Sequence, residues 1–126
     1  ASKRAALPPG VTVWPPCSRE ALREHYRTAD VFLFPSYFEG FGLVLLEAMS
    51  SGLPALASEA TAGPDVLTES CGRLIPCGSL EALVEELKWF VVHQERLPSM
   101  ALAARQRAAR FTWASYRKQV SEAVGA

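Results

Sequence analysis

The sequence predicts an α/β domain in which an open sheet of parallel strands is covered by helices. Two observations carry this prediction: strand-like and helix-like stretches alternate along the chain, and residues 31–34 are continuously apolar. Strands that alternate with helices lie parallel and are joined by right-handed crossovers. A continuously apolar strand is typical of one that is buried on both faces. With 126 residues, the chain has the length of one domain.

Strands are expected where short apolar or β-branched runs end at proline, glycine or serine. These runs occupy residues 11–14, 31–34, 54–58 and 73–75. Pro15 closes the first run, Pro35 closes the second and Pro76 closes the last. Proline cannot donate a ladder hydrogen bond, so it marks these ends well.

Helices are expected where a capping residue precedes a segment of helix formers. Ser18 is placed to cap a helix through about residue 28, and Ser79 to cap one from 80 to about 93. A helix over 43–51 ends at Gly52, and a shorter turn is expected at 65–69 within a loop over 59–72. Pro98 separates the long helix from a final helical region that breaks near 111–112. These elements predict one domain over 1–126, with the helices of 95–126 packed on it.

Composition excludes several classes of protein. Thirteen basic residues balance thirteen acidic ones, so no overall charge draws the chain to nucleic acid. The three cysteines (Cys17, Cys71 and Cys77) lack C-x-x-C spacing, which predicts reduced thiols, no metal site and a cytoplasmic location. Apolar runs are shorter than a transmembrane helix needs. Basic residues gather over 96–121, where a peripheral membrane contact and a solvated helix pair are alternative interpretations.

The segment from Pro35 to Met49 carries the chemistry. A buried strand ends there, Gly40 and Gly42 follow, and a helix begins. Ligands of open α/β sheets bind outside the carboxyl ends of the strands, and free N–H groups at a helix start favour a diphosphate. Two carboxylates flank that position, Glu39 before the helix and Glu47 about one turn inside it. They suit the hydroxyl-rich rings on either side of a nucleotide-sugar diphosphate, although a loop with two solvated glutamates fits the spacing equally.

A family resemblance decides between these interpretations. The segment P-S-x-x-E-G-F-G-L-x-x-L-E-A-M over 35–49, with Y-x-x-A-D-V-F-x-x-P over 26–35, resembles the E-x7-E signature of retaining GT-B glycosyltransferases of family 4. Gly63-Pro-Asp65 resembles the G-x-x-E segment of that family, with Asp65 in place of glutamate. The resemblance spans residues 11 to about 94. It implies a Rossmann-like open parallel sheet with flanking helices, the carboxyl-terminal donor-binding part of a GT-B fold.

The resemblance also implies site residues. Glu39 would be the catalytic carboxylate, contacting donor-sugar hydroxyls and supporting charge at the anomeric carbon, and Glu47 would bind the ribose hydroxyls. The donor-binding set is Glu39, Gly40, Phe41, Gly42, Leu43, Val44 and Glu47, in which backbone N–H groups hold the diphosphate. Trp14, Pro15 and Pro16 follow a strand where the family places the nucleobase. The resemblance implies a UDP-, GDP- or ADP-sugar as substrate, with no cofactor and no metal.

The resemblance further implies partners. Family members hold the acceptor in an amino-terminal domain and clamp the diphosphate with an Arg and a Lys, and nothing before residue 11 matches that clamp. We therefore expect a hexosyltransferase fragment that is inactive alone and requires an amino-terminal domain or subunit. A non-catalytic nucleotide-binding or assembly subunit of a split enzyme stays open as an alternative. An unpaired sheet edge would permit a dimer, and the cytoplasmic face of a membrane is a second location consistent with the basic segment.

Overall fold

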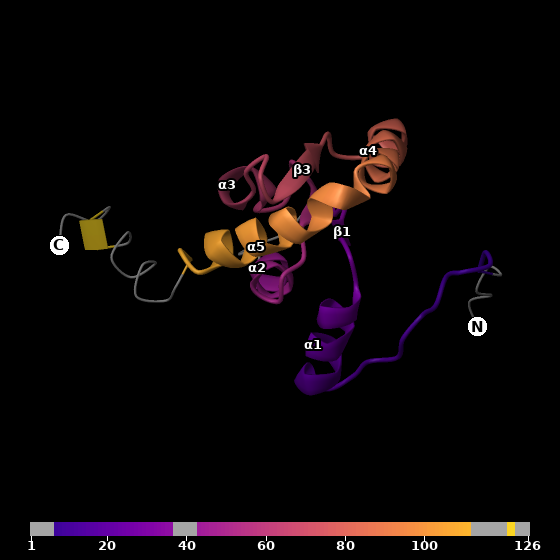
Figure 1. Cartoon of the computed structure of the whole chain (residues 1–126), viewed down its shortest axis with the longest axis horizontal. Helices are drawn as coiled ribbons and strands as arrows, with labels where there is room; N and C mark the ends of the chain where they lie inside the picture. The colour runs from indigo at the N-terminus through magenta and orange to yellow at the C-terminus, as the bar shows by residue number, and fades with distance from the viewer. Residues whose placement is uncertain (1–6, 37–42, 112–120, 123–126) are drawn as a thin grey trace.

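The protein contains a parallel sheet with helices on both faces. The computed structural model describes residues 7–36, 43–111 and 121–122. The strands are β1 (Phe32–Phe34), β2 (Ala55–Ser58) and β3 (Gly72–Ile75), and they lie in the order β1-β2-β3. Both pairings are parallel, with Phe32 opposite Ala55 and Ala55 opposite Gly72. The predicted α/β class and parallel sheet are confirmed, with β1 and β3 at the edges of the described sheet (Figure 1).

Helices connect and cover these strands. They are α1 (Arg19–Thr28), α2 (Leu43–Ser50), α3 (Gly63–Val66), α4 (Leu80–Val92), the 3-10 helix η1 (Gln94–Arg96) and α5 (Leu97–Ala108). Figure 1 shows α5 running alongside α2, and these two helices contact each other closely. Helix α5, which follows α4 and η1 in the chain, therefore packs against α2, the helix that precedes β2.

The capping serines act as the sequence predicts. The Ser18 side chain accepts a hydrogen bond from the Ala21 N–H at 3.2 Å, and that of Ser79 accepts one from Ala82 at 3.1 Å. Each bond satisfies one of the donors that a helix start leaves unpaired. Helices α1 and α4 consequently begin at the expected residues. Gly52 follows α2 with a φ of 89°, the left-handed conformation that glycine adopts without strain.

Two apolar cores flank β2, which is buried along its whole length. On one face, Ala55 and Ala57 pack with residues of α2, α3 and α5, including Leu45 and Met49. On the other face, Leu56 packs with Ile75, Phe90 of α4 and Met100 of α5. Successive strand residues alternate between these faces, so the central strand is covered on both.

The strand predicted at residues 11–14 is not formed. Val11, Val13 and Trp14 are about half to two-thirds exposed, at 50%, 56% and 63%. Figure 1 shows the segment that precedes α1 extending away from the sheet. A strand requires a neighbour for its backbone N–H and C=O groups, and within the described residues this segment has none. The β-branched pattern was correct for an extended backbone and wrong for a paired one.

Smaller differences have local causes. Leu33 of β1 is 43% exposed, so this strand is not buried on both faces as predicted; it lies at the edge of the described sheet. Helix α3 begins two residues earlier than expected, because Thr61 accepts a hydrogen bond from the Gly63 N–H at 2.9 Å. Pro98 lies inside the first turn of α5 rather than between helices, a position where its missing N–H costs nothing.

Gly72 sets how closely β3 approaches β2. A Cβ atom added there would lie 2.5 Å from the Ala55 carbonyl oxygen and 2.8 Å from a methyl carbon of Leu67. The carbonyl belongs to the buried central strand and cannot move aside without shifting the ladder. The absence of a side chain at this position therefore permits the pairing.

We expect Gly72→Ala to destabilise the protein by about 1–3 kcal/mol, the usual cost of overpacking a core. Chemical denaturation followed by circular dichroism measures the change in the free energy of unfolding. Ser70→Ala is the control, because it places an alanine at an exposed position two residues before Gly72. Equal stabilities for Gly72→Ala and the unsubstituted protein would contradict the close approach described here.

Candidate functional site

The predicted donor-binding loop is described only in part. Glu39, Gly40, Phe41 and Gly42 lie outside the described residues. Leu43 and Val44 begin α2, with side chains 51% and 41% exposed. The first N–H groups of a helix have no acceptor within it, so these residues can offer donors to an anion at this end of α2. In chain order, α2 is the element that follows β1.

The packing of α2 determines where Glu47 points. Leu45 and Met49 are fully buried against the sheet and α5, and Ala48 is fully buried against Tyr26 of α1 and Leu53. With about 100° between successive helix residues, Glu47 lies about 200° from both Leu45 and Met49. The Glu47 side chain is therefore directed away from the core, and it is exposed. Burial of one helix face holds this carboxylate outward, where it can meet a ligand.

The end of α2 is closed by its own serines. The Ser50 and Ser51 hydroxyls both donate to the Glu47 carbonyl, at 2.8 Å and 3.1 Å. The Leu53 N–H donates to the Ala48 carbonyl at 3.2 Å, across the turn at Gly52. These bonds satisfy carbonyls that the helix end leaves unpaired. The backbone that carries Glu47 is thereby fixed at both its packed face and its last turn.

Tyr26 joins α1 to this helix. Its ring is 7% exposed, packs with Ala48 and Leu53, and meets the Phe32 ring edge-on with centroids 5.9 Å apart. Burial raises the pKa of the Tyr26 hydroxyl, and the negative charge of Glu47 and then that of Cys17 raise it further. The phenol therefore remains protonated and available as a hydrogen-bond donor beside Glu47.

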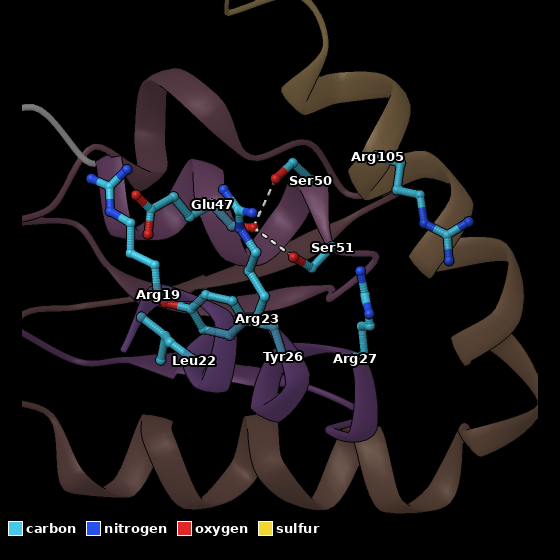
Figure 2. A pocket seen from close by; sticks show the side chains of 9 residues that line it. All are labelled: Arg19, Leu22, Arg23, Tyr26, Arg27, Glu47, Ser50, Ser51 and Arg105. Carbon is cyan, nitrogen blue, oxygen red and sulfur yellow. Dashed lines mark hydrogen bonds between the residues drawn. The ribbon is translucent and has the colours of Figure 1, made fainter. Parts of the chain in front are cut away.

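A pocket of about 480 Å³ lies between α1 and α2. Figure 2 shows Glu47 and Ser50 of α2, together with Ser51 directly after this helix, facing side chains of α1 across the pocket. The α1 side chains are Arg19, Leu22, Arg23, Tyr26 and Arg27, and Arg105 of α5 completes the lining. Glu47 is thus brought together with four arginines that the sequence interpretation did not include.

The sequence contains a pattern that could have predicted three of these four arginines as neighbours. Arg19, Arg23 and Arg27 recur every four residues within the segment capped by Ser18, which places them along one side of a helix. Arg105 lies far away in the chain, and no local pattern connects it with Glu47. Its guanidinium lies over Gly52, where an added Cβ would be 2.7 Å from its nitrogens.

The predicted nucleobase segment precedes α1 and contacts it at His25. The Trp14 ring lies 4.4 Å from that of His25, centroid to centroid, and its side chain is 63% exposed. Pro15 and Pro16 are exposed as well. None of these three lines the pocket beside Glu47. The nucleobase role of Trp14, Pro15 and Pro16 therefore stays a prediction.

Other polar groups have structural partners. Arg73 of β3 pairs with Glu86 of α4 and lies 4.3 Å from the centre of the Trp89 ring. Arg107 donates to the carbonyls of Val66 and Asp65 at 2.7 Å and 3.1 Å, closing the end of α3. Across the described ranges, no group of three or more His, Cys, Asp or Glu side chains could hold a metal ion. None of the described helices is long and apolar enough to span a membrane.

Comparison with known proteins identifies relatives of this chain. Residues 2–107 match the family described as glycosyl transferases group 1. The chain is 37% identical over 98 residues to sulfoquinovosyl transferase SQD2 of Arabidopsis thaliana, covering 75% of this chain and 19% of that protein. The chain therefore spans about a fifth of the length of this relative.

Solved structures resemble the same region. Sucrose-phosphate synthase of Thermosynechococcus elongatus superposes with a TM-score of 0.71 at 31% identity, over 83% of this chain and 27% of that one. Anabaena HepE, whose structure is a complex with UDP, gives a TM-score of 0.68 at 23% identity, over 81% and 29%. The chain belongs to the group 1 glycosyltransferases, and its parallel sheet with flanking helices is part of the Rossmann-like carboxyl-terminal domain of a GT-B fold.

Proposed function

We propose that this chain binds the donor of a glycosyl transfer, a nucleotide-diphospho-sugar. The observation that carries the proposal is the outward position of Glu47, held by the buried face of α2 and bordering a pocket. In this proposal, Glu47 accepts hydrogen bonds from the ribose hydroxyls. The N–H groups of Phe41, Gly42, Leu43 and Val44 hold the diphosphate, with Gly40 permitting its close approach.

Glu39 is the proposed catalytic carboxylate. It would contact the hydroxyls of the donor sugar and stabilise positive charge that develops at the anomeric carbon. The leaving diphosphate would take the proton of the acceptor hydroxyl, as expected for a retaining transfer. The protein would then contribute mainly by positioning groups and stabilising charge, and the proposal requires neither a metal nor a cofactor.

The acceptor would be held by an amino-terminal domain or by a separate subunit. This chain spans about a fifth of the length of its Arabidopsis relative, and we propose that sugar transfer requires the further part. A split enzyme, with this chain as its nucleotide-binding or assembly subunit, uses the same donor site. Transfer assays with the chain alone and with a separate acceptor-binding chain distinguish the two arrangements, because only a split enzyme regains activity on mixing.

Glu47→Ala is expected to abolish nucleotide binding while leaving the fold intact, because the Glu47 side chain is exposed and lacks a packing role. Calorimetric titration with UDP, GDP and ADP measures this. UDP comes first, since it occupies a protein of this fold. Binding of one nucleotide in the micromolar to millimolar range corresponds to about −8 to −4 kcal/mol.

Glu85→Ala is the matched control, an exposed glutamate of α4 that does not line the pocket. It should bind the nucleotide as the unsubstituted chain does. Unchanged binding by Glu47→Ala would refute the ribose role, and loss of cooperative unfolding in that variant would make Glu47 structural. If this chain binds no nucleotide, the same titration is repeated with a longer protein that contains it. Binding by the longer protein would show that the affinity depends on the Arg and Lys that clamp the diphosphate.

Tyr26 provides an independent check on the charge at Glu47. Because folding raises the pKa of Tyr26 above its ordinary value of 10.0, the unfolded chain releases this proton first as the pH rises. The stability that Tyr26 contributes is therefore complete below about pH 10 and is lost as the pH increases through the folded-state pKa.

We expect Glu47→Gln to lower the Tyr26 pKa toward its ordinary value, since the variant removes one negative charge near the hydroxyl. Tyrosinate absorbance against pH, taken as the difference between each protein and its Tyr26→Phe counterpart, isolates this group. Glu85→Gln should leave the titration unchanged. A Tyr26 pKa that is the same in Glu47→Gln and in the unsubstituted chain would place the carboxylate away from the hydroxyl.

A further inference from the structure

The pocket beside Glu47 is strongly positive. Among the described residues that line it, four are arginines, namely Arg19, Arg23, Arg27 and Arg105, and one is a glutamate, which gives these residues a formal charge of +3. The whole chain has a net charge of zero. The excess is therefore a local feature, and it surrounds a space of about 480 Å³. We call these four side chains and the space between them the arginine groove.

Two features of the arginines on α1 do not favour the helix. Arg19, Arg23 and Arg27 lie at four-residue intervals on α1, where like charges repel each other. Arg19 is also in the first turn, at the positive end of the helix dipole, where an acidic residue would be stabilising. Arg27, in the last turn, is favourably placed for the dipole, so the helix disfavours the position of Arg19 and the repetition of like charge.

Neighbouring acids neutralise little of the positive charge of the groove arginines. Arg27 pairs with Glu24 at 3.3 Å, but both side chains are about two-thirds exposed, at 69% and 65%. Within the residues that the structure describes, Arg19, Arg23 and Arg105 form no ion pair. This contrasts with Arg73, which pairs with Glu86, and with Arg107, which closes α3. The guanidinium groups of the groove remain available to an added anion.

The arrangement of the groove suits a phosphate. A guanidinium offers parallel N–H donors that match two oxygens of a phosphate group. Figure 2 shows Arg23 and Arg27 extending from α1 and Arg105 extending from α5, and all three line the same pocket. A phosphate in that pocket would be met from α1 on one side and from α5 on the other. Tyr26 adds a protonated hydroxyl to the lining.

We propose that the arginine groove binds a phosphate-ester anion, at a place distinct from that of the donor diphosphate. The donor diphosphate is proposed at the first turn of α2, around residues 41–44. The groove extends to the opposite end of this helix, because Ser50, Ser51 and Arg105 line it. The anion is either a soluble phosphorylated compound or the headgroup of an anionic lipid. Both present the same chemistry to the arginines.

The test begins with a soluble probe, glycerol 3-phosphate, titrated into the full chain by calorimetry. We expect binding that weakens at least tenfold in Arg23→Gln and in Arg105→Gln. Arg110→Gln is the matched control: it removes the same charge from an exposed residue just beyond α5 that does not line the groove. Thermal unfolding of each variant establishes that it is folded. Equal weakening in Arg110→Gln would indicate general charge attraction and overturn the proposal.

A second arm distinguishes the source of the phosphate. Flotation with phosphatidylcholine vesicles, with and without phosphatidic acid, shows whether a lipid headgroup is bound. Binding to either probe that depends on Arg23 and Arg105 supports the groove and names its ligand class. The proposal is overturned by folded protein that binds neither probe, or by binding that both arginine variants retain.

Glu47→Gln separates this proposal from the donor site. Removal of the carboxylate should strengthen glycerol 3-phosphate binding, because Glu47 is the one acid among the described residues that line the groove. The donor proposal predicts the opposite for a nucleoside diphosphate, whose ribose would lose its acceptor. Failure of nucleotide binding thus leaves the phosphate result interpretable. Weaker glycerol 3-phosphate binding in Glu47→Gln would count against the groove.

Discussion

The burial of one face of α2 is the constraint on which the site depends. Leu45, Ala48 and Met49 have no exposed surface, and each large side chain among them stabilises the fold by about 1.5–3 kcal/mol when buried. Leu45 and Met49 share a cluster with Ala55 and Ala57 on β2 and with Ala104 on α5, and these small side chains let the helices approach the sheet closely. Ala48 packs with Tyr26 and Leu53 instead. Once that face is fixed, the rotation of α2 is fixed as well. The direction of Glu47 follows from core packing and needs no bond to its own carboxylate.

The described arginines of the basic segment over 96–121 have different structural roles. Arg96 lies 5.2 Å from the centre of the Trp89 ring, and Arg107 donates to carbonyls at the end of α3. Arg105 alone among these three lines the pocket beside Glu47. A run of like charges in a sequence therefore does not act as one surface. The periodicity of the helix directs successive arginines toward different neighbours, and the role of each arginine depends on the neighbour that it contacts.

Elements with local signals were predictable from the sequence, and those that depend on distant neighbours were not. The helix capped by Ser18 begins and ends as expected, because its cap and its charges are all within the segment. Residues 11–14 have a strand pattern without a strand, because pairing requires a second segment. The outward carboxylate at Glu47 follows from helix periodicity, whereas Arg105 reaches the same pocket only through the packing of α5 on α2. Glu39 and the glycines of the loop lie outside the described residues and stay predictions.

A net charge of zero excludes a field over the whole molecule, yet it does not bear on a single pocket. At physiological ionic strength, charges are screened over about 8 Å, so a ligand responds to the side chains around it and not to the total. The acids that balance the arginines of the groove lie largely outside it, as Glu86 does beside Arg73. The protein is therefore neutral as a chain and positive beside Glu47. Composition reports only the sum of the charges, and that sum does not reveal the local charge that distinguishes this pocket.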